Sequence, residues 1–265
     1  MAGINTNVNS INAQRNLAST AISLATSMQR LSSGLRVNTA KDDAAGLAIA
    51  ERMDAQTRGM NVAIRNSNDA ISLAQTAEGA LGVISQNLQR MRELAVQGSN
   101  GTNTTADVAA LDAEFTVLVA ENTRIAGAAK FNGNVVIAAT TYQFQVGANT
   151  ADTISVTGAA YTGTSTTLGT TNVTANAELA KLDVDIDAVT TARATWGATQ
   201  NRFEGVIANL RVSAENSAAA HGRIVDADYA METANLTRAQ VLQQAGTAMV
   251  AQANQGPSGV LALLR

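Results

Sequence analysis

The two ends of the chain share a composition that constrains how they can fold: residues 1–41 and 233–265 contain neither aspartate nor glutamate. All 21 acidic residues lie between Asp42 and Glu232, whereas the ends hold six of the 18 basic residues. Most of their other side chains are amides, hydroxyls or aliphatic groups. Burying these groups costs less free energy than burying a charge, because a neighbouring amide can satisfy a buried polar group. The composition therefore predicts that the two ends pack together in one tightly packed layer.

The segment between the ends is acidic, with 12 basic and 21 acidic residues, and the whole chain has a formal charge of −3. Binding of duplex nucleic acid requires clustered Lys and Arg side chains, and the sequence has no such cluster. Only 3% of the residues are aromatic although 46% are hydrophobic. A core of small aliphatic side chains favours helices packed on helices at short distance. We therefore expect a mainly α protein that does not bind nucleic acid.

Apolar residues near both ends recur in alternating steps of three and four, which is the period of a coiled-coil seam. Similar seams run through residues 81–95 and 203–214. Such narrow stripes do not stabilise an isolated helix, because the cost of helix nucleation dominates. We expect the terminal helices to become ordered only against partners. The predicted self-assembly seams contain Leu17, Leu24, Met28, Leu31, Leu35, Leu242 and Met249.

Turn and capping residues divide the chain into segments. Gly34 favours the end of the first helix, and Asp42 and Asp43 favour the start of the next. Helical patterns then cover 42–97 and 105–128, and the longer one would reach ~80 Å if unbroken. The predicted segments are an N-terminal helix with a linker (1–41), helices of a rod (42–130), a short variable segment (131–175), a further rod helix (176–232) and a C-terminal helix (233–265). We expect interruptions of the later helical pattern near Gly222 and at Gly256-Pro257.

The variable segment has the pattern of β structure. Residues 142–146 and 153–157 alternate or carry β-branched side chains, with Gly147 between them, and they predict a hairpin. Residues 158–174 are rich in Thr and Gly, which predicts an exposed low-complexity loop and a better candidate for O-linked sugar than the chance N-glycosylation motifs. The predicted fold is mainly α: a long coiled-coil-like helical rod formed by the N- and C-terminal halves, with a small β-hairpin region in the middle.

Residues for catalysis or metal binding are nearly absent from the sequence. Cysteine is missing and His221 is the one histidine, so a thiolate site and a two-histidine site cannot form. Asp183, Asp185 and Asp187 imitate the first half of a calcium loop, but the later Gly and Glu positions both hold Ala. We therefore interpret these aspartates as a solvated helix face. The sequence predicts no enzyme activity, no cofactor and no metal.

The sequence also lacks the pattern of a signal peptide or a membrane span. The first ten residues have neither a basic region nor an apolar run, and no apolar run reaches ~18 residues. We expect neither a cleaved signal peptide nor a membrane span. An export route that uses no cleaved signal would give the same pattern.

Several sequence blocks resemble bacterial flagellins, and they follow one another in the order of that family. The longest is QRLSSGLRVNTAKDDAAGLAIA at residues 29–50. Further blocks are DAISLAQTAEGAL at 69–81, LQRMRELAVQ at 88–97, DADY at 226–229, ETANLTR at 232–238 and QAGTAM at 244–249. The chain resembles a short form, because residues 131–175 stand where typical flagellins insert large variable domains.

The resemblance implies a structural subunit that polymerises outside the cell into the flagellar filament used for swimming. It implies that the acid-free terminal helices form an inner layer and residues 42–232 a surrounding one. The implied partners are further copies of the chain, an export chaperone, the filament cap and hook-junction proteins. Export would use the flagellar apparatus without a cleaved signal peptide. Two alternatives stay open here: a hook–filament junction protein and another secreted coiled-coil interaction protein.

The block at 88–97 also implies a contact with the flagellin-sensing Toll-like receptor of animal hosts. The matching positions are Leu88, Gln89, Arg90, Leu94 and, on the next helix, Glu114. By its spacing Leu88 lies on a seam and belongs to the core, whereas Arg90 lies off the seam. Alternatively, the block resembles other flagellins only because packing in the filament constrains the sequence of this helix.

Overall fold

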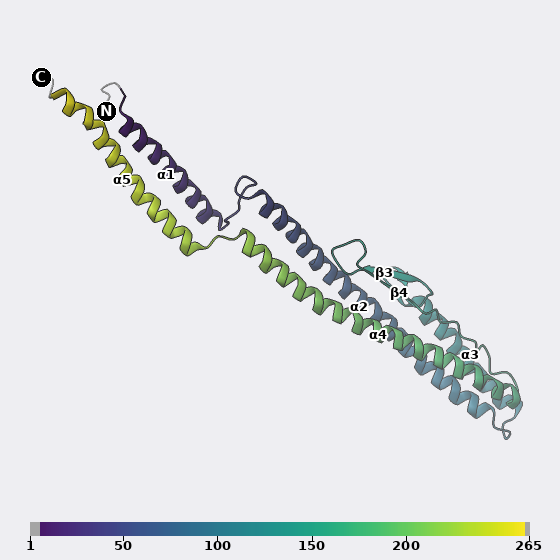
Figure 1. The fold of residues 1–265 in the computed structure, drawn as a ribbon. Helices are drawn as coiled ribbons and strands as arrows, with labels where there is room; N and C mark the ends of the chain where they lie inside the picture. The colour runs from purple at the N-terminus through teal and green to yellow at the C-terminus, as the bar shows by residue number, and fades with distance from the viewer. Residues whose placement is uncertain (1–5, 263–265) are drawn as a thin grey trace. The chain divides into compact units, whose positions relative to one another are not determined.

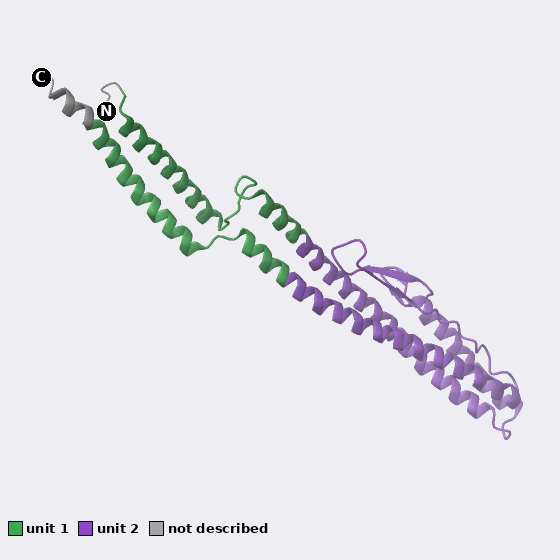
Figure 2. Cartoon of the chain, in the orientation of Figure 1, with its two compact units in different colours: residues 1–55, 216–265 green, residues 56–215 purple. Residues whose placement is uncertain are grey.

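A computed structural model describes residues 6–262, and their side chains up to Gln255. The chain divides into two compact units, residues 1–55 with 216–265 and residues 56–215 (Figure 2). Five α-helices and two short antiparallel hairpins make up the described chain. The predicted fold class, mainly α with a small β region in the middle, is confirmed.

In the first unit, α1 (Val8–Ser33) and α5 (Tyr229–Ala262) lie side by side and antiparallel (Figure 1). Asn7 caps α1, because its side-chain oxygen accepts a hydrogen bond from the Ser10 N–H. Gly34 ends the helix in the left-handed conformation (φ 73°), with its N–H on the Arg30 carbonyl. Ser10 Oγ donates to Asn254 Oδ1 across the pair at 2.7 Å.

Helix α5 continues through Gly256-Pro257 to Ala262, so the break predicted there is wrong. Pro257 has no N–H to donate to the carbonyl one turn earlier, that of Ala253. Asn7 Nδ2 donates to this carbonyl instead, at 2.7 Å. The start of α1 thus supplies the hydrogen bond that the proline cannot make.

The predicted break near Gly222 is also displaced. Helix α4 (Asn172–Val225) continues past Gly222, and α5 begins at Tyr229. Between them, Ala227 N–H donates to the Gly34 carbonyl at 2.9 Å, and Arg36 N–H donates to the Val225 carbonyl at 2.6 Å. The chain breaks where the two non-helical segments can satisfy each other's backbone groups, rather than at the glycine.

The second unit contains most of α2 (Ala44–Gly98) and α4, together with α3 (Thr105–Ala128). Helix α4 runs antiparallel to α2, as the ion pair between Arg92 and Asp183 (2.7 Å) and the Gln200–Glu78 hydrogen bond (3.0 Å) show. Aliphatic residues of α2 and α4 and a few large rings form its core. Fully buried members include Leu81, Ile84, Leu88, Met91, Leu94, Phe115, Leu182, Trp196 and Phe203.

The hairpin predicted for the middle is present, with β3 (Thr141–Gln145) paired to β4 (Thr153–Thr157). Phe144 faces Ile154 in this register, and its ring packs edge-on against Phe203 of α4 with ring centroids 5.4 Å apart. A second, smaller hairpin joins β1 (Lys130–Phe131) to β2 (Asn134–Val135), and the sequence pattern did not predict it. Its turn residues Asn132 and Gly133 both have positive φ, and an Asn-Gly pair is the local signal that could have located this turn.

Most residues of the Thr-rich segment after β4 are exposed, as the sequence predicted, but buried residues anchor it to the core. Ser165 and Leu168 are buried, the latter completely. Asp112 of α3 accepts the N–H groups of Leu168 and Gly169, at 2.6 and 3.3 Å. Carboxylates on neighbouring helices therefore satisfy the backbone of the loop and hold it against the core.

Asp185 is the second of these carboxylates, and its predicted place on a solvated helix face is wrong. The residue is 3% exposed. Its oxygens accept the N–H groups of Thr164 and Ser165 and the Thr164 hydroxyl, at 2.8–3.1 Å. Asp183, which pairs with Arg92, and Asp187 are exposed as predicted.

Candidate assembly surface

Helices α1 and α5 bury an unusual set of side chains against each other. The buried residues of α1 are Ser10 and Ser27, and α5 contributes Ala239 and Glu232. Leu17, Leu24, Leu31 and Leu35 are half-buried. Where Leu17 crosses α5, it faces Gly246, and a Cβ atom built on this glycine would lie 3.0 Å from Leu17 Cδ1. Small residues thus let the two backbones approach closely.

The remaining predicted seam residues are only partly covered. Met28, Leu242 and Met249 are 51%, 52% and 63% exposed, respectively. Further large aliphatic side chains on the same two helices are more than half exposed, namely Val8, Ile11, Ile22 and Val241. The α1–α5 pair therefore buries hydroxyls and small residues while it leaves large apolar side chains in solvent, which is the reverse of a self-sufficient pair of helices.

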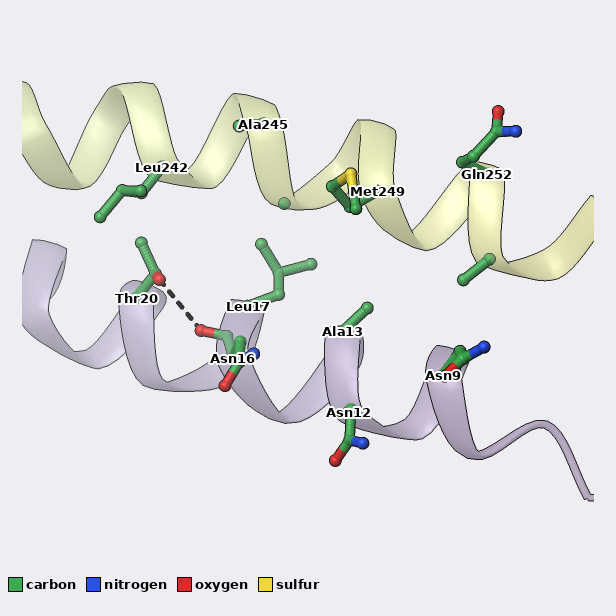
Figure 3. A pocket seen from close by; sticks show the side chains of 12 residues that line it. Asn9, Asn12, Ala13, Asn16, Leu17, Thr20, Leu242, Ala245, Met249 and Gln252 are labelled. Carbon is green, nitrogen blue, oxygen red and sulfur yellow. Dashed lines mark hydrogen bonds between the residues drawn. The ribbon is translucent and has the colours of Figure 1, made fainter. Parts of the chain in front are cut away.

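Two grooves run along the α1–α5 pair. The first has a volume of about 640 Å³, with Leu17 and Met249 in its middle, Leu242 and Thr20 toward one end and Asn9 and Gln252 toward the other (Figure 3). The second has a volume of about 550 Å³ and is lined by hydroxyl side chains of α1 together with Arg30, Glu232 and Arg238. Both grooves can accept side chains of a partner: one is mainly apolar, and the other is polar and charged.

One ion pair crosses the pair of helices. Arg30 Nη1 lies 3.9 Å from Glu232 Oε2, which is beyond hydrogen-bond distance. The Nε atom of Arg30 is buried and has no hydrogen-bond partner. The positive charge of Arg30 is thus only partly compensated within the chain.

The positions suggested for receptor contact divide into two groups. Leu88 and Leu94 are fully buried in the core of the second unit. Gln89, Arg90 and Glu114 are exposed. Arg90 Nε lies 2.9 Å from Glu114 on α3, and its Nη1 lies 3.0 Å from Glu93. Hydrogen bonds from the guanidinium to Glu114 and then Glu93 raise the pKa of Arg90 above its usual value.

The described residues offer little for catalysis. Across residues 6–262, the His, Asp and Glu side chains form no group of three or more that could hold a metal ion. His221 is half-buried near the end of α4. No helix in the described chain is long and apolar enough to span a bilayer.

Known proteins that are similar to this chain belong to one family of helical proteins. A family model of the bacterial flagellin N-terminal helical region matches residues 4–141, and a model of the C-terminal helical region matches residues 179–264. A flagellin of Halalkalibacterium halodurans is 47% identical over 270 residues, which cover 99% of both chains. A flagellin of Bacillus subtilis (strain 168) is 40% identical over 302 residues, again with 99% of each chain covered.

A crystal structure of Bacillus cereus flagellin is similar to this fold, with a TM-score of 0.52 and 38% sequence identity. The match covers 59% of this chain and 94% of the other. Paired terminal helices that leave large apolar side chains exposed fit a structural protein that assembles through contacts between its subunits. The chain belongs to the bacterial flagellins, and it is a structural subunit of the flagellar filament; none of these matches favours a hook–filament junction protein.

Proposed function

We propose that α1 and α5 form the surface through which this filament subunit binds further copies of itself. The observation that carries the proposal is the exposure of large aliphatic side chains along both helices, among them Ile22 at 69% and Met249 at 63%. Full burial of one such side chain contributes about 1.5–3 kcal/mol. Several of them on each subunit supply enough free energy to offset the cost of association.

The composition of the ends supports the same role. Between identical subunits, a contact that does not close on itself repeats and produces a filament. Layers of repeated helices bury side chains from many copies, and carboxylates in such a layer would require partners. Residues 1–41 and 233–265 contain none. This absence favours terminal helices that become buried in the assembled filament.

A substitution on this surface tests the proposal. Ile22→Asn on α1 removes an exposed apolar side chain and adds no charge to the helix. We expect a large loss of seeded polymerisation, measured by sedimentation and electron microscopy, with unchanged circular dichroism of the monomer. Val117→Asn on α3 is the matched control, because Val117 is 67% exposed outside the terminal helices. Equal polymerisation by the two variants would contradict the proposal.

We further propose that the chain leaves the cell through the flagellar export apparatus without a cleaved signal peptide, and that it meets an export chaperone, the cap and hook-junction proteins on its way. Flagellin relatives form an extracellular filament, which supports a secreted destination. The test is the mass of the protein recovered from the medium, and its recovery from a host that lacks the export apparatus. A shortened N-terminus, or undiminished secretion by that host, would exclude this route.

For an animal flagellin receptor, we propose a contact centred on Arg90 and Glu114, with Gln89 beside them. The exposed Arg90–Glu114 pair supports this surface, since Arg is frequent among residues that dominate binding energy. We expect Arg90→Ala and Glu114→Ala monomers to bind the Toll-like receptor more weakly than the unsubstituted monomer. Arg92→Ala is the control, because Arg92 is similarly exposed but pairs with Asp183 of α4. Undiminished binding by both variants would remove this proposal and leave the filament assignment intact.

A further inference from the structure

The charges of the chain are divided between its ends and its middle in a way that limits how copies can pack. The two ends hold six basic residues and no acidic one, whereas the rest of the chain has 21 acidic and 12 basic residues. If terminal helices met only terminal helices of other copies, the one carboxylate that the described parts of α1 and α5 could place near their cations would be Glu232, which is buried beside Arg30. Contacts among the other cations would bring like charges together, which is unfavourable in a desolvated interface.

The second groove between α1 and α5 concentrates this unbalanced charge. Its basic residues are Arg30 and Arg238, and its one acidic residue is Glu232. Glu232 is buried and lies 3.9 Å from Arg30, which leaves the Arg30 Nε without a hydrogen bond. Arg238 is exposed, and it forms no ion pair with any residue that the structure describes. The groove therefore presents an uncompensated guanidinium beside a partly compensated one.

Suitable anions are available elsewhere on the chain. Glu51, Asp69, Asp187, Glu204 and Glu215 are exposed, and none of them belongs to an ion pair in the described structure. All lie between residues 42 and 232. A guanidinium can hold a carboxylate through two parallel hydrogen bonds, which fixes orientation as well as distance.

We propose that this groove, centred on Arg238 with Arg30 beside it, receives an aspartate or glutamate side chain from the 42–232 segment of a second copy. The inference rests on the proposed function, because it assumes that α1 and α5 meet other subunits. It adds the kind of contact: besides apolar packing, a terminal pair from one copy binds the acidic middle segment of another. This contact would set the register between copies, since a paired charge tolerates less sliding than an apolar stripe.

Zero-length crosslinking tests the contact directly. Arg238→Lys places an amine in the groove, and a carbodiimide joins an amine only to a carboxylate that touches it. Filaments are assembled from equal amounts of ¹⁴N- and ¹⁵N-labelled protein, so that mass spectrometry separates bonds between copies from bonds within one. We expect mixed-isotope crosslinks from the introduced lysine to an aspartate or glutamate between residues 42 and 232. Arg15→Lys, on α1 outside the groove, measures the background of the reaction.

A second measurement uses the intact chain without a crosslinker. Arg238→Glu replaces attraction by repulsion, and we expect the critical concentration for polymerisation to rise about tenfold, with a smaller rise at high salt. Crosslinks to Glu232 of the same copy, crosslinks to a chain-terminal carboxylate, a yield no higher than that of Arg15→Lys, or an unchanged critical concentration would each overturn the inference. Filaments would still form in those cases, whereas failure of the unsubstituted protein to polymerise would contradict the proposed function itself.

Discussion

Asp185 and Asp112 each accept backbone N–H groups of the loop after β4 and hold it against the core of the second unit. Asp183, Asp185 and Asp187 alternate along one stretch of α4, yet only the middle one is buried. Alternation on a helix places neighbours about 200° apart, so the three cannot share one face. That geometry could have separated them in the sequence. The loop that covers Asp185 could not be foreseen, because its Thr and Gly residues are equally typical of an exposed segment.

Asp185→Asn should loosen this loop and destabilise the second unit. The amide keeps the size of the carboxylate but replaces charge-assisted hydrogen bonds to Thr164 and Ser165 with weaker ones. Its NH₂ group also replaces one acceptor oxygen and then faces a backbone N–H donor. We expect a loss of about 1.5–3 kcal/mol in the free energy of unfolding, measured by denaturant titration. Asp187→Asn is the matched control on the exposed side of the same helix. Equal stability of the two variants would show that the loop does not depend on Asp185.

At the scale of helices and strands, the sequence located elements well where a capping residue marks the end. The predicted helix at 105–128 has the observed bounds of α3, and its start carries a reciprocal capping box between Thr104 and Asp107. In the predicted hairpin, the first strand is shifted by one residue from β3 and the second has the bounds of β4. The ends of α4 and α5 could not be predicted in the same way. They depend on hydrogen bonds to Gly34, Arg36 and Asn7, which lie nearly two hundred residues or more away along the chain.

The capping box makes the start of α3 sensitive to acid. Hydrogen bonds from the Thr104 hydroxyl and then its backbone N–H lower the pKa of Asp107 below its ordinary value of 3.8. A lowered folded-state pKa means that the carboxylate stabilises the fold above the unfolded pKa, and that this contribution is lost as pH falls through the folded pKa. We expect amides in the first turn of α3 to exchange faster in Asp107→Asn than in the unsubstituted protein at neutral pH. The difference should shrink as the pH falls through the lowered folded-state pKa of Asp107, and a difference that is constant with pH would contradict this assignment.

The close approach of α1 and α5 at Gly246 gives a second test of an element contact. A valine at this position would crowd Leu17, whose Cδ1 atom lies 3.0 Å from the place that a Cβ atom would occupy, and overpacking of this kind costs about 1–3 kcal/mol. Gly246→Val should therefore accelerate hydrogen exchange throughout α1. Gly205→Val on α4 adds the same side chain where no atom lies within 4 Å, so it controls for helix propensity. Slow exchange of α1 in both variants would mean that the contact with α5 does not protect it.

For the whole molecule, composition and family motifs predicted the class of protein. Both can be identified in stretches of neighbouring residues, without knowledge of which distant residues come into contact. The ends lack acids and the flagellin-like blocks follow in order, and family models match both halves. Which face of each terminal helix stays uncovered could not be predicted. Met28, Leu242 and Met249 have the spacing of a buried seam, yet small residues occupy the closest contact and these three side chains stay more than half exposed.

The main cluster of buried apolar residues runs from Ala70 to Phe203, so it belongs to the second unit and includes no described residue of α1 or α5. Stability of residues 42–232 therefore depends little on the ends, whereas polymerisation depends on them if the proposed surface is correct. Removal of residues 1–40 or 233–265 should abolish filament formation and leave a soluble, largely helical protein. Sedimentation measures the first outcome and circular dichroism the second. Filaments formed by either truncated chain would exclude the terminal helices as the assembly surface, and loss of helicity throughout the remaining chain would show that the core needs them.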